Sequence, residues 1–397
     1  MEYYFNKNLT NIPASASLAV AEKARNMKAQ GIDVISLAMG EPDFDTPYPI
    51  RFAAVDSIIQ GHTHYSQARG ILPLREAIAK KLREENGIDC TSQQILLAPG
   101  GKYAVFEAVT ALITPQSGDE VMVLNPAWVS YEPMVIAAGG VPVEVPLSFG
   151  NNYKIDREIL EKYVSDKTRA MILNYPNNPT GCILSEEEAE IVADFAIDHN
   201  LILISDEIYE RICFDGYQSK SMESIERVKD YVITINGFSK SVAMTGWRMG
   251  YLCGPQEIID KIFLFHQHTI SCLSDFCQEG AVKAFECCKE DIEKMVQSYQ
   301  ERRDQFVNDL NAIPNVTCHM PKGAFYAWTE FDLGDMDSMQ ISDFLLEKAH
   351  VATVPGAAYG QGGDKCVRMS FATTPADLKE AVQRMDRAVR EYLAKGE

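Results

Sequence analysis

The sequence predicts an α/β fold built on a mostly parallel sheet, and two observations support this prediction. Between about residues 95 and 255, short apolar runs alternate with amphipathic stretches, which is typical of repeated βα units. Most of these apolar runs are continuous, as expected for strands that helices cover on both faces. The predicted strands are residues 95–98, 121–124, 170–173, 201–205, 231–235 and 250–253.

Helices are predicted between the strands from the spacing of apolar residues and from capping signals. Leu74, Ile78 and Leu82 lie four residues apart within residues 72–85, and Gly87 follows as a C-terminal stop. The other predicted helices are residues 103–113, a helix that opens at the capping box 185–188 and runs to about residue 199, and residues 291–310 and 375–395.

The length and a change in sequence pattern predict two domains. A chain of 397 residues is long enough for two or three domains. After about residue 290 the βα pattern gives way to a long charged helix, short strands and a final helix, which indicates a smaller domain. We expect an N-terminal arm with part of the small domain at 1–46, a large domain at 47–290 and the small C-terminal domain at 291–397.

The charge balance excludes some classes of partner. With 37 Lys and Arg against 56 Asp and Glu, the formal net charge is −19. Binding to nucleic acid or to an anionic membrane surface needs clustered cations, so neither partner is expected. No uninterrupted apolar run reaches about 18 residues, so no membrane span is expected either.

The cysteines favour a reducing compartment. The ten Cys contain no CxxC pair and lie mostly in apolar runs. This pattern is typical of buried thiols in the cytosol and not of a disulfide framework or a zinc site. We therefore expect a cytoplasmic protein without a metal site.

Chemically active residues follow several of the predicted strands. In open α/β sheets ligands bind beyond the carboxyl ends of the strands. Gly100, Gly101 and Lys102 follow the strand 95–98 and lead into a helix, where free N–H groups and the helix dipole favour an anion. Because two glycines before a helix are more often only a turn, this signal is weak alone, and it lacks the spacing of a Walker loop or a GxGxxG motif.

Two further strand ends carry charged residues. Asp206 follows the strand 201–205, where burying a carboxylate is costly unless it meets a cation or a donor. Lys240 follows the strand 231–235, and Arg248 stands eight residues later between apolar neighbours. Two such cations near one edge of a sheet indicate a cleft for an anion. The acidic character of the whole chain therefore does not exclude an anionic small molecule.

Together these segments resemble the class I aminotransferases of fold type I, which depend on pyridoxal 5′-phosphate (PLP), and in particular their bacterial-type aspartate aminotransferase branch. The resemblance covers nearly the whole chain and implies the PLP-dependent transferase fold, with a large domain and a smaller α/β domain. The segments that carry it are residues 40–44, 63–66, 70–75, 100–102, 126–131, 174–181, 206–209, 239–250, 354–356 and 368–370.

The resemblance implies a role for each residue around the cofactor ring. Lys240 matches the lysine that holds PLP as a Schiff base and, once substrate frees it, moves the proton between the substrate Cα and the cofactor. Asp206 matches the carboxylate that keeps the pyridine nitrogen protonated, so that the ring acts as an electron sink. Tyr209 and Asn178 match residues that hydrogen-bond the 3′-oxygen, and Trp128 matches the aromatic that stacks on the ring.

A phosphate site and a dimer follow from the same resemblance. The backbone N–H groups of Gly101 and Lys102, the Ser239 hydroxyl and the Arg248 guanidinium are expected to hold the phosphate. Tyr65 matches a tyrosine that reaches the phosphate of the neighbouring subunit. We therefore expect a homodimer with its active sites at the subunit interface.

The substrates implied are an amino acid and a 2-oxo acid. Arg368 matches the arginine that binds the α-carboxylate, and the backbone of Gly40 and the side chain of Asn178 are expected to complete that site. Lys102 matches a lysine that approaches the distal carboxylate of dicarboxylic substrates. Trp128 is also expected to contact the substrate. The expected reaction moves the amino group of L-aspartate to 2-oxoglutarate.

Other reactions stay open at this point. A lysine at the position of Lys102 also occurs in relatives that act on other amino acids. An aminotransferase for alanine or aromatic amino acids is therefore an alternative. A PLP-dependent lyase, such as a C–S β-lyase, shares residues like Lys240 and Arg368. A non-catalytic PLP-binding protein is disfavoured, since no chemical residue is missing and no DNA-binding appendage is fused to the chain.

Overall fold

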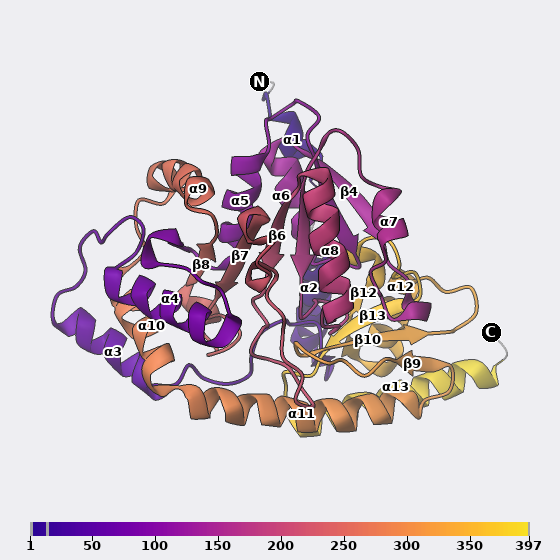
Figure 1. The fold of residues 1–397 in the computed structure, drawn as a ribbon. Helices are drawn as coiled ribbons and strands as arrows, with labels where there is room; N and C mark the ends of the chain where they lie inside the picture. Colours follow the sequence, from indigo (N-terminus) through magenta and orange to yellow (C-terminus); the bar gives the residue numbers. More distant parts are fainter. Residues whose placement is uncertain (1–2, 13–15, 396–397) are drawn as a thin grey trace.

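A seven-stranded sheet forms the centre of the protein, of which the computed structural model describes residues 3–12 and 16–395 (Figure 1). The strand order is β2-β8-β7-β6-β5-β3-β4. All pairs are parallel except those of β8, which runs antiparallel to β2 and β7. The predicted α/β fold with a mostly parallel sheet is confirmed. The strands are β2 Ile95–Ala98, β3 Glu120–Asn125, β4 Val141–Pro146, β5 Thr168–Asn174, β6 Ile202–Asp206, β7 Val232–Gly237 and β8 Gly250–Cys253.

The sequence pattern predicts six of these strands and does not reveal β4. The ends of the six differ from the predicted ends by at most two residues. Strand β4 lies at the edge of the sheet, contains Pro142 and Pro146, and is only partly buried. Proline cannot donate to a strand ladder and is tolerated at an edge, so β4 lacks the apolar run of a central strand.

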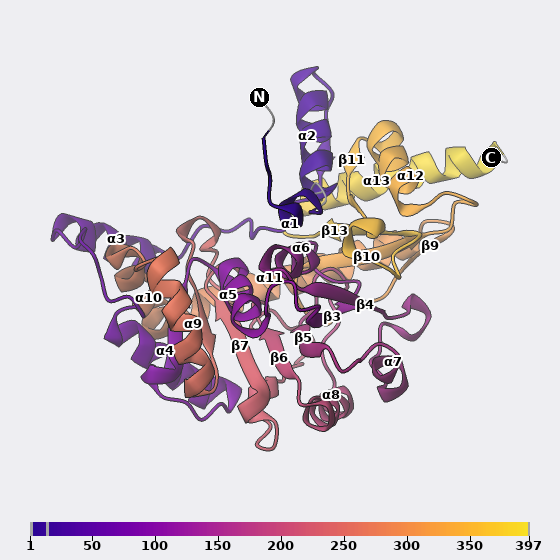
Figure 2. The ribbon, with the colours of Figure 1, turned by 90° about the horizontal axis from the view of Figure 1, so that it is seen from above.

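Helices cover both faces of the sheet, which explains the continuous apolar strands (Figure 2). Along β5, Ala170 and Ile172 pack in a cluster with residues of α5 and α6, whereas Met171 and Leu173 pack with residues of α8. Because side chains alternate across a strand, cover on both faces requires apolar residues at every position. The helices of this part are α3 Tyr48–Ile59, α4 Leu72–Asn86, α5 Gly101–Leu112, α6 Tyr131–Ala138, α7 Arg157–Glu161, α8 Glu186–His199, α9 Gln256–Thr269 and α10 Asp275–Cys287.

The predicted helix ends hold where a capping signal marks them. Ser185 and Glu188 form the expected capping box at the start of α8. Gly87 ends α4 with φ 70°, a left-handed conformation that glycine adopts without strain. Helix α5 begins at Gly101, two residues earlier than predicted, so Gly101 and Lys102 lie in its first turn.

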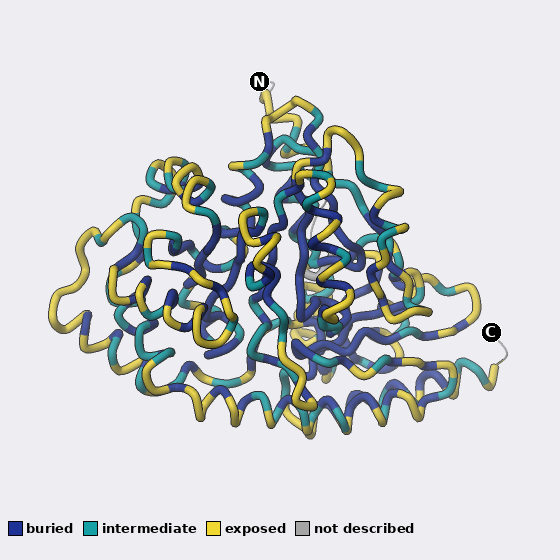
Figure 3. The backbone as a smooth tube through the Cα atoms, viewed as in Figure 1, coloured by how far each residue is buried: buried dark blue, intermediate teal, exposed yellow. Residues whose placement is uncertain are grey.

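A second, four-stranded sheet forms near the C-terminus, in the order β12-β13-β10-β9. The long helix α11 runs below both sheets and alternates buried and exposed side chains along its length (Figures 1 and 3). Strand β1 pairs with β11, so the N-terminal segment joins the C-terminal part. The remaining elements are α1 Lys7–Thr10, α2 Ala16–Ala29, β1 Ile35–Ser36, α11 Lys289–Asn311, β9 Val316–Cys318, β10 Tyr326–Phe331, α12 Ser338–Phe344, β11 Val351–Ala352, β12 Val354–Pro355, β13 Cys366–Ser370 and α13 Pro375–Ala394.

The domain limits at residues 46 and 290 stay predictions. Helix α11 begins beside the core that holds Ile292 and continues into the core that holds Phe306, so it belongs to both parts. No helix among the described residues is both long and apolar enough to cross a membrane.

Candidate active site

A cavity of about 390 Å³ lies where β5, β6 and β7 end, with β10 and β13 of the smaller sheet forming another wall. Its lining includes every residue that the sequence predicts for the site, except Tyr65. The residues brought together are Gly40, Gly101, Lys102, Trp128, Asn178, Asp206, Tyr209, Ser239, Lys240, Arg248 and Arg368.

Tyr65 lies outside this cavity. Its side chain is 92% exposed and lies beside Cys272 and Asp275 in a separate depression. A role for Tyr65 at the site of its own subunit is therefore not supported, and the expected role at a neighbouring subunit stays a prediction.

Asp206 is a buried carboxylate that ends β6. Its Oδ2 accepts a hydrogen bond from Tyr131 Oη at 2.7 Å, and its Oδ1 accepts one from the Ile208 backbone N–H at 3.2 Å. Burial raises the pKa of Asp206 to about 6, although the Tyr131 bond and the nearby Lys240 act in the opposite direction. The carboxylate is therefore largely ionised at pH 7 and can stabilise a cationic N–H in the cavity.

Lys240 presents an amine with a lowered pKa. Its Nζ donates to the Gly40 carbonyl at 2.5 Å. Burial and the positive charge of Arg368 lower the pKa of Lys240 to about 8, with Arg248 contributing and Glu41 opposing. A sizeable fraction of this amine is neutral near pH 7 to 8, and a neutral amine is what nucleophilic attack on an aldehyde requires.

Arg368 on β13 is held in place but keeps unused donor capacity. Its Nη2 donates to the Ala38 carbonyl at 2.6 Å and its Nη1 to Asn178 Oδ1 at 3.1 Å. The guanidinium lies over the Tyr326 ring at 4.5 Å, while Nε has no hydrogen-bond partner among the described residues. Since a buried donor without a partner is costly, this side chain is prepared for a carboxylate.

The anion end of the cavity is formed by the start of α5 and by Arg248. Gly100 has φ 85°, and a Cβ atom there would lie 2.5 Å from Arg248 Nη2, so only glycine fits. Arg248 Nη1 donates to the Thr245 carbonyl at 2.9 Å, and Nη2 donates to the Pro99 carbonyl at 3.2 Å. The guanidinium therefore lies against the N-terminus of α5, where N–H groups also attract an anion.

Lys102 and Trp128 lie next to each other in the wall of the cavity. Lys102 Nζ lies 4.9 Å from the centre of the Trp128 ring. Burial lowers the pKa of Lys102, and the charge of Arg248 lowers it further. Lys102 therefore contacts an aromatic face, and it has no carboxylate partner among the residues that the structure describes.

Three tyrosines of the site escape the sequence prediction. The first is Tyr326, whose Oη lies 2.7 Å from Oη of the predicted Tyr209. The second is Tyr131, which donates a hydrogen bond to Asp206, and the third is Tyr359, whose ring centre lies 5.3 Å from the Arg368 guanidinium carbon. Tyr326 comes from the smaller sheet, so the rule that sites follow parallel strands gives no signal for it. Tyr131 does stand three residues after Trp128 in the segment that carries the resemblance.

The residues present fit PLP on chemical grounds. The cofactor offers an aldehyde, a basic ring nitrogen and a phosphate, and the cavity offers an amine, a buried carboxylate and a cation beside a helix start. The orphan Nε of Arg368 leaves a separate place for a substrate carboxylate. Among the described residues, no group of three or more His, Cys, Asp or Glu could hold a metal ion.

The chain is similar to known aminotransferases over most of its length. The family described as "Aminotransferase class I and II" matches residues 32–385. The aspartate aminotransferase of Pyrococcus abyssi is 42% identical over 364 residues, which is 90% of this chain and 92% of that protein. The aromatic-amino-acid aminotransferase 2 of Thermococcus litoralis is 41% identical over 369 residues, or 91% of this chain and 94% of that protein.

Solved structures agree with this similarity. The aspartate aminotransferase of Thermus thermophilus with maleate superposes with a TM-score of 0.92 at 36% identity, covering 98% of this chain and all of that one. The resemblance inferred from the sequence motifs is thus confirmed. This chain belongs to the class I and II aminotransferases and is a PLP-dependent enzyme of that family.

Proposed function

We propose that this aminotransferase moves the amino group of L-aspartate to 2-oxoglutarate. The observation that carries the proposal is the presence of Arg368 and Lys102 in one cavity, because a dicarboxylic substrate needs two cations. The relatives named aspartate aminotransferase add support.

Each residue is assigned one task in this proposal. PLP supplies an aldehyde that bonds amines and a ring that withdraws electrons from the attached Cα. Lys240 would hold PLP through its aldehyde, and its amine, with a lowered pKa, would move the proton at the substrate Cα. Asp206 would stabilise the protonated ring nitrogen, and Tyr209 would donate a hydrogen bond to the 3′-oxygen.

The two ends of the cavity bind anions. Arg248, the Ser239 hydroxyl and the N–H groups of Gly101 and Lys102 hold the phosphate, and the Trp128 ring covers the cofactor. Arg368 binds the substrate α-carboxylate with help from Asn178 and the Gly40 backbone. Fixing that carboxylate also fixes which Cα bond stands perpendicular to the ring, and so favours loss of the proton over loss of CO2.

Aromatic amino acids are the second candidate donors. Lys102 Nζ lies against the Trp128 ring, and Leu18, Ala21 and Met39 add apolar surface to the cavity. An aromatic side chain could occupy such a wall. The Thermococcus litoralis relative named for aromatic amino acids points in the same direction.

A panel of amino donors decides between these candidates. Purified enzyme with PLP is given L-aspartate, L-alanine or L-phenylalanine with 2-oxoglutarate, and glutamate is measured. The proposal expects L-aspartate to give the highest kcat/KM, and Lys102→Ala to lower it more for aspartate than for phenylalanine. Absence of glutamate from every donor, or pyruvate and ammonia from cystathionine without an oxo acid, would contradict it.

We also propose a homodimer in which Tyr65 reaches the phosphate of the neighbouring subunit. Helix α3 exposes Tyr48, Phe52, Val55 and Ile59, each by more than half of its surface. A contiguous apolar helix face of this kind is typical of a subunit interface. Mass measurement in solution tests the dimer, and Tyr65→Phe should weaken PLP binding without changing the mass.

The compartment is inferred from the cysteines. All ten are free thiols, and most are buried or half-buried. Free thiols persist in a reducing environment, which supports the cytoplasm. Fractionation of the native host followed by detection of the protein would test this.

A further inference from the structure

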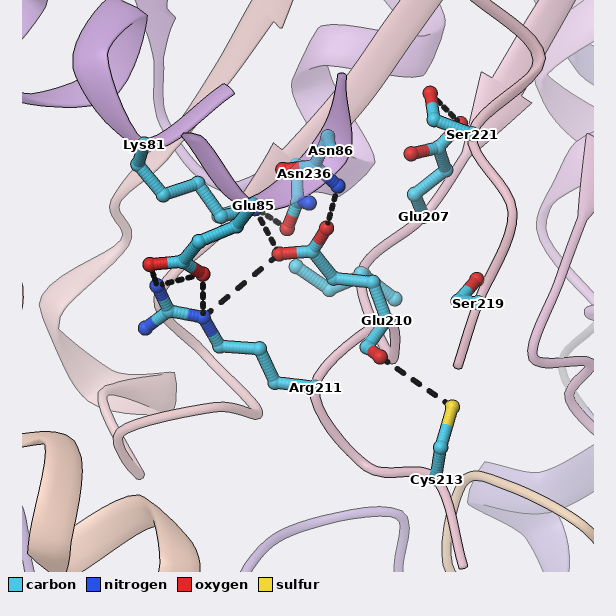
Figure 4. Close-up of polar contacts among 12 residues, drawn as sticks. Lys81, Glu85, Asn86, Glu207, Glu210, Arg211, Cys213, Ser219, Ser221 and Asn236 are labelled. Carbon is cyan, nitrogen blue, oxygen red and sulfur yellow. Dashed lines mark hydrogen bonds and ion pairs between the residues drawn. The ribbon is translucent and has the colours of Figure 1, made fainter. Parts of the chain in front are cut away.

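The turn after β6 has two chemically different faces. Asp206, Ile208 and Tyr209 line the cavity. Glu207 and Glu210 of the same turn point to its other side, toward the C-terminal end of α4 and the segment around Ser221 (Figure 4). One short backbone segment therefore carries both sets of residues. Asp206 and Tyr209 hold PLP in the proposed function, and Glu207 and Glu210 lie on the opposite side.

Glu210 is bound by helix α4 through both of its carboxylate oxygens. Oε1 pairs with Lys81 Nζ, and Oε2 accepts a hydrogen bond from Asn86 Nδ2. The side chains of Lys81 and Glu210 are 4% and 9% exposed. Although burial raises the pKa of Glu210, Lys81 and Arg211 lower it by more, so the group stays ionised. We call Lys81, Asn86 and Glu210 the α4 clamp.

The next residue strengthens the same attachment. Arg211 Nε and Nη2 donate to the two oxygens of Glu85 at 3.1 and 2.7 Å, and Arg211 Nε lies 4.0 Å from Glu210 Oε1. Two successive residues of the turn are thus tied to the last two turns of one helix. A double attachment of this kind restrains rotation of the turn as well as its distance from the helix.

Backbone hydrogen bonds restrain the turn as well, since Glu207 N–H donates to the Ile235 carbonyl at 2.8 Å and Ala324 N–H donates to the Ile212 carbonyl at 2.9 Å. Within the turn, Glu210 N–H donates to the Glu207 carbonyl at 3.0 Å, and Ile212 N–H donates to the Tyr209 carbonyl at 2.8 Å. Glu207 is satisfied separately, by hydroxyl donors from Ser205 and Ser221 at 2.9 and 2.8 Å. On the side away from the cavity, the α4 clamp and the Arg211–Glu85 pair are the contacts that link the turn to helix α4.

A buried ion pair is poor at raising stability, since the loss of hydration offsets most of the attraction. Replacing such a pair by apolar side chains is often neutral or stabilising, whereas removing one partner is destabilising. What an apolar replacement cannot supply is direction, because only the carboxylate of Glu210 binds two donors, Lys81 and Asn86, with its two oxygens. A positioning role and a purely structural role can therefore be separated by experiment.

We propose that Glu210 is a positioning residue, and that the α4 clamp sets the orientation of the turn that places Asp206 and Tyr209 in the cavity. The assignment of those two residues to PLP rests on the proposed function. The effect of the α4 clamp on the backbone of the turn does not depend on it.

The test uses two variants and one matched control. Glu210→Gln keeps the shape but leaves Lys81 without its charge partner, and the double variant Lys81→Met with Glu210→Met replaces the pair by apolar volume. Asp215→Asn is the control, because it removes one of the two carboxylate partners of Arg303, which is 2% exposed, at a place that does not line the cavity. Melting temperature, PLP dissociation constant, kcat and KM are measured for each.

We expect Glu210→Gln to weaken PLP binding and to lower kcat by about tenfold each, a size typical of lost second-layer contacts, with KM for the amino donor within twofold. The double variant should recover the melting temperature but not the PLP affinity or kcat. The proposal would be overturned if the double variant had wild-type PLP affinity and kcat. It would also be overturned if Asp215→Asn lost as much PLP affinity and kcat as Glu210→Gln at an equal fall in melting temperature.

Amide hydrogen exchange gives a readout that needs no turnover. In Glu210→Gln, the amides of Glu210 and Ile212 should exchange at least about tenfold faster, while those of residues 174–181 stay unchanged. Unchanged exchange at both amides would refute the positioning role even if activity falls. If wild-type protein neither bound PLP nor produced glutamate, the proposed function would be wrong. The exchange rates would still test whether the α4 clamp orients the turn.

Discussion

The two faces of the turn after β6 contain similar chemical groups but differ in how completely the protein pairs the charged ones. Behind the turn, Glu210 has Lys81 and Asn86, and Glu207 has two hydroxyl donors. In the cavity, Lys240 bonds one carbonyl and Arg368 keeps an orphan Nε. Among the residues that the structure describes, the atoms without a partner behind the turn are neutral amide atoms, Asn86 Oδ1 and Asn236 Nδ2, whereas in the cavity a charged guanidinium keeps a free donor. Because buried charged groups are normally paired, the cavity face is the one built for a ligand.

Removing the amine of the cavity face should have the largest effect. Lys240→Ala is expected to lower kcat on the order of 10⁴-fold or more, as for other covalent catalytic residues. The fold should stay intact, since Lys240 contributes a single hydrogen bond. Glutamate formation and the melting curve measure both. Lys365→Ala, which breaks an exposed pair with Asp332, serves as the control, and near-wild-type turnover of Lys240→Ala would refute its assigned role.

Two adjacent carboxylates test the comparison most directly. Asp206→Asn removes the charge that the proposed function assigns to the ring nitrogen, and it should lower kcat/KM by about 10²- to 10³-fold, the size seen for lost electrostatic partners in active sites. Glu207→Gln, one residue away on the other face, should stay within about twofold at pH 7, because Glu207 is largely protonated there. Equal losses in the two variants would mean that the faces do not differ in function.

A substitution at the substrate end of the cavity should raise KM for the amino acid. Arg368→Leu removes charged hydrogen bonds to the α-carboxylate, so KM for the amino acid is expected to rise by about tenfold to a hundredfold. The fall in kcat should be smaller, because Lys240 and Asp206 remain. Initial rates over a range of amino-acid concentrations measure this. An unchanged dependence on concentration would contradict the assignment, and the exposed Arg227→Leu provides a comparison.

The smallest effect concerns stability behind the turn. Burial and the charge of Glu210 raise the pKa of Glu207 from its ordinary 4.5 to about 8. A carboxyl group with a higher pKa in the fold than in the unfolded chain stabilises the fold below pH 4.5, and that contribution is lost as the pH rises through 8. Glutamine cannot ionise, so the melting temperature of Glu207→Gln should gain on wild type between pH 5 and pH 8.5. Parallel curves over this range would argue against a raised pKa.

Much of the fold follows from local sequence signals. The central strands contain continuous apolar runs, and the C-terminal end of α4 and the start of α8 are marked by Gly87 and by the Ser185 capping box. Edge strand β4 escapes because its prolines and partial exposure remove the usual signal. Strands can therefore be predicted from the sequence where burial dictates the residue type, and they are missed where it does not.

The site divides in the same way. Residues at the ends of parallel strands, such as Asp206 and Lys240, can be found from their position in the sequence. Tyr326 approaches from a separate antiparallel sheet, and Lys81 reaches the turn across 129 residues of chain. Contacts of this kind depend on tertiary packing, which no local pattern encodes.

The pairing of β1 with β11 has a consequence for biosynthesis. It joins residues 35 and 36 to residues 351 and 352, and in the same region the Ala38 carbonyl accepts a hydrogen bond from Arg368. Contacts between such distant positions form late in folding, since a long loop must close first. A ribosome must therefore release nearly the whole chain before Arg368 can bond the Ala38 carbonyl. A truncated product that ends before Arg368 would carry the Lys240 amine without the group assigned to orient its substrate.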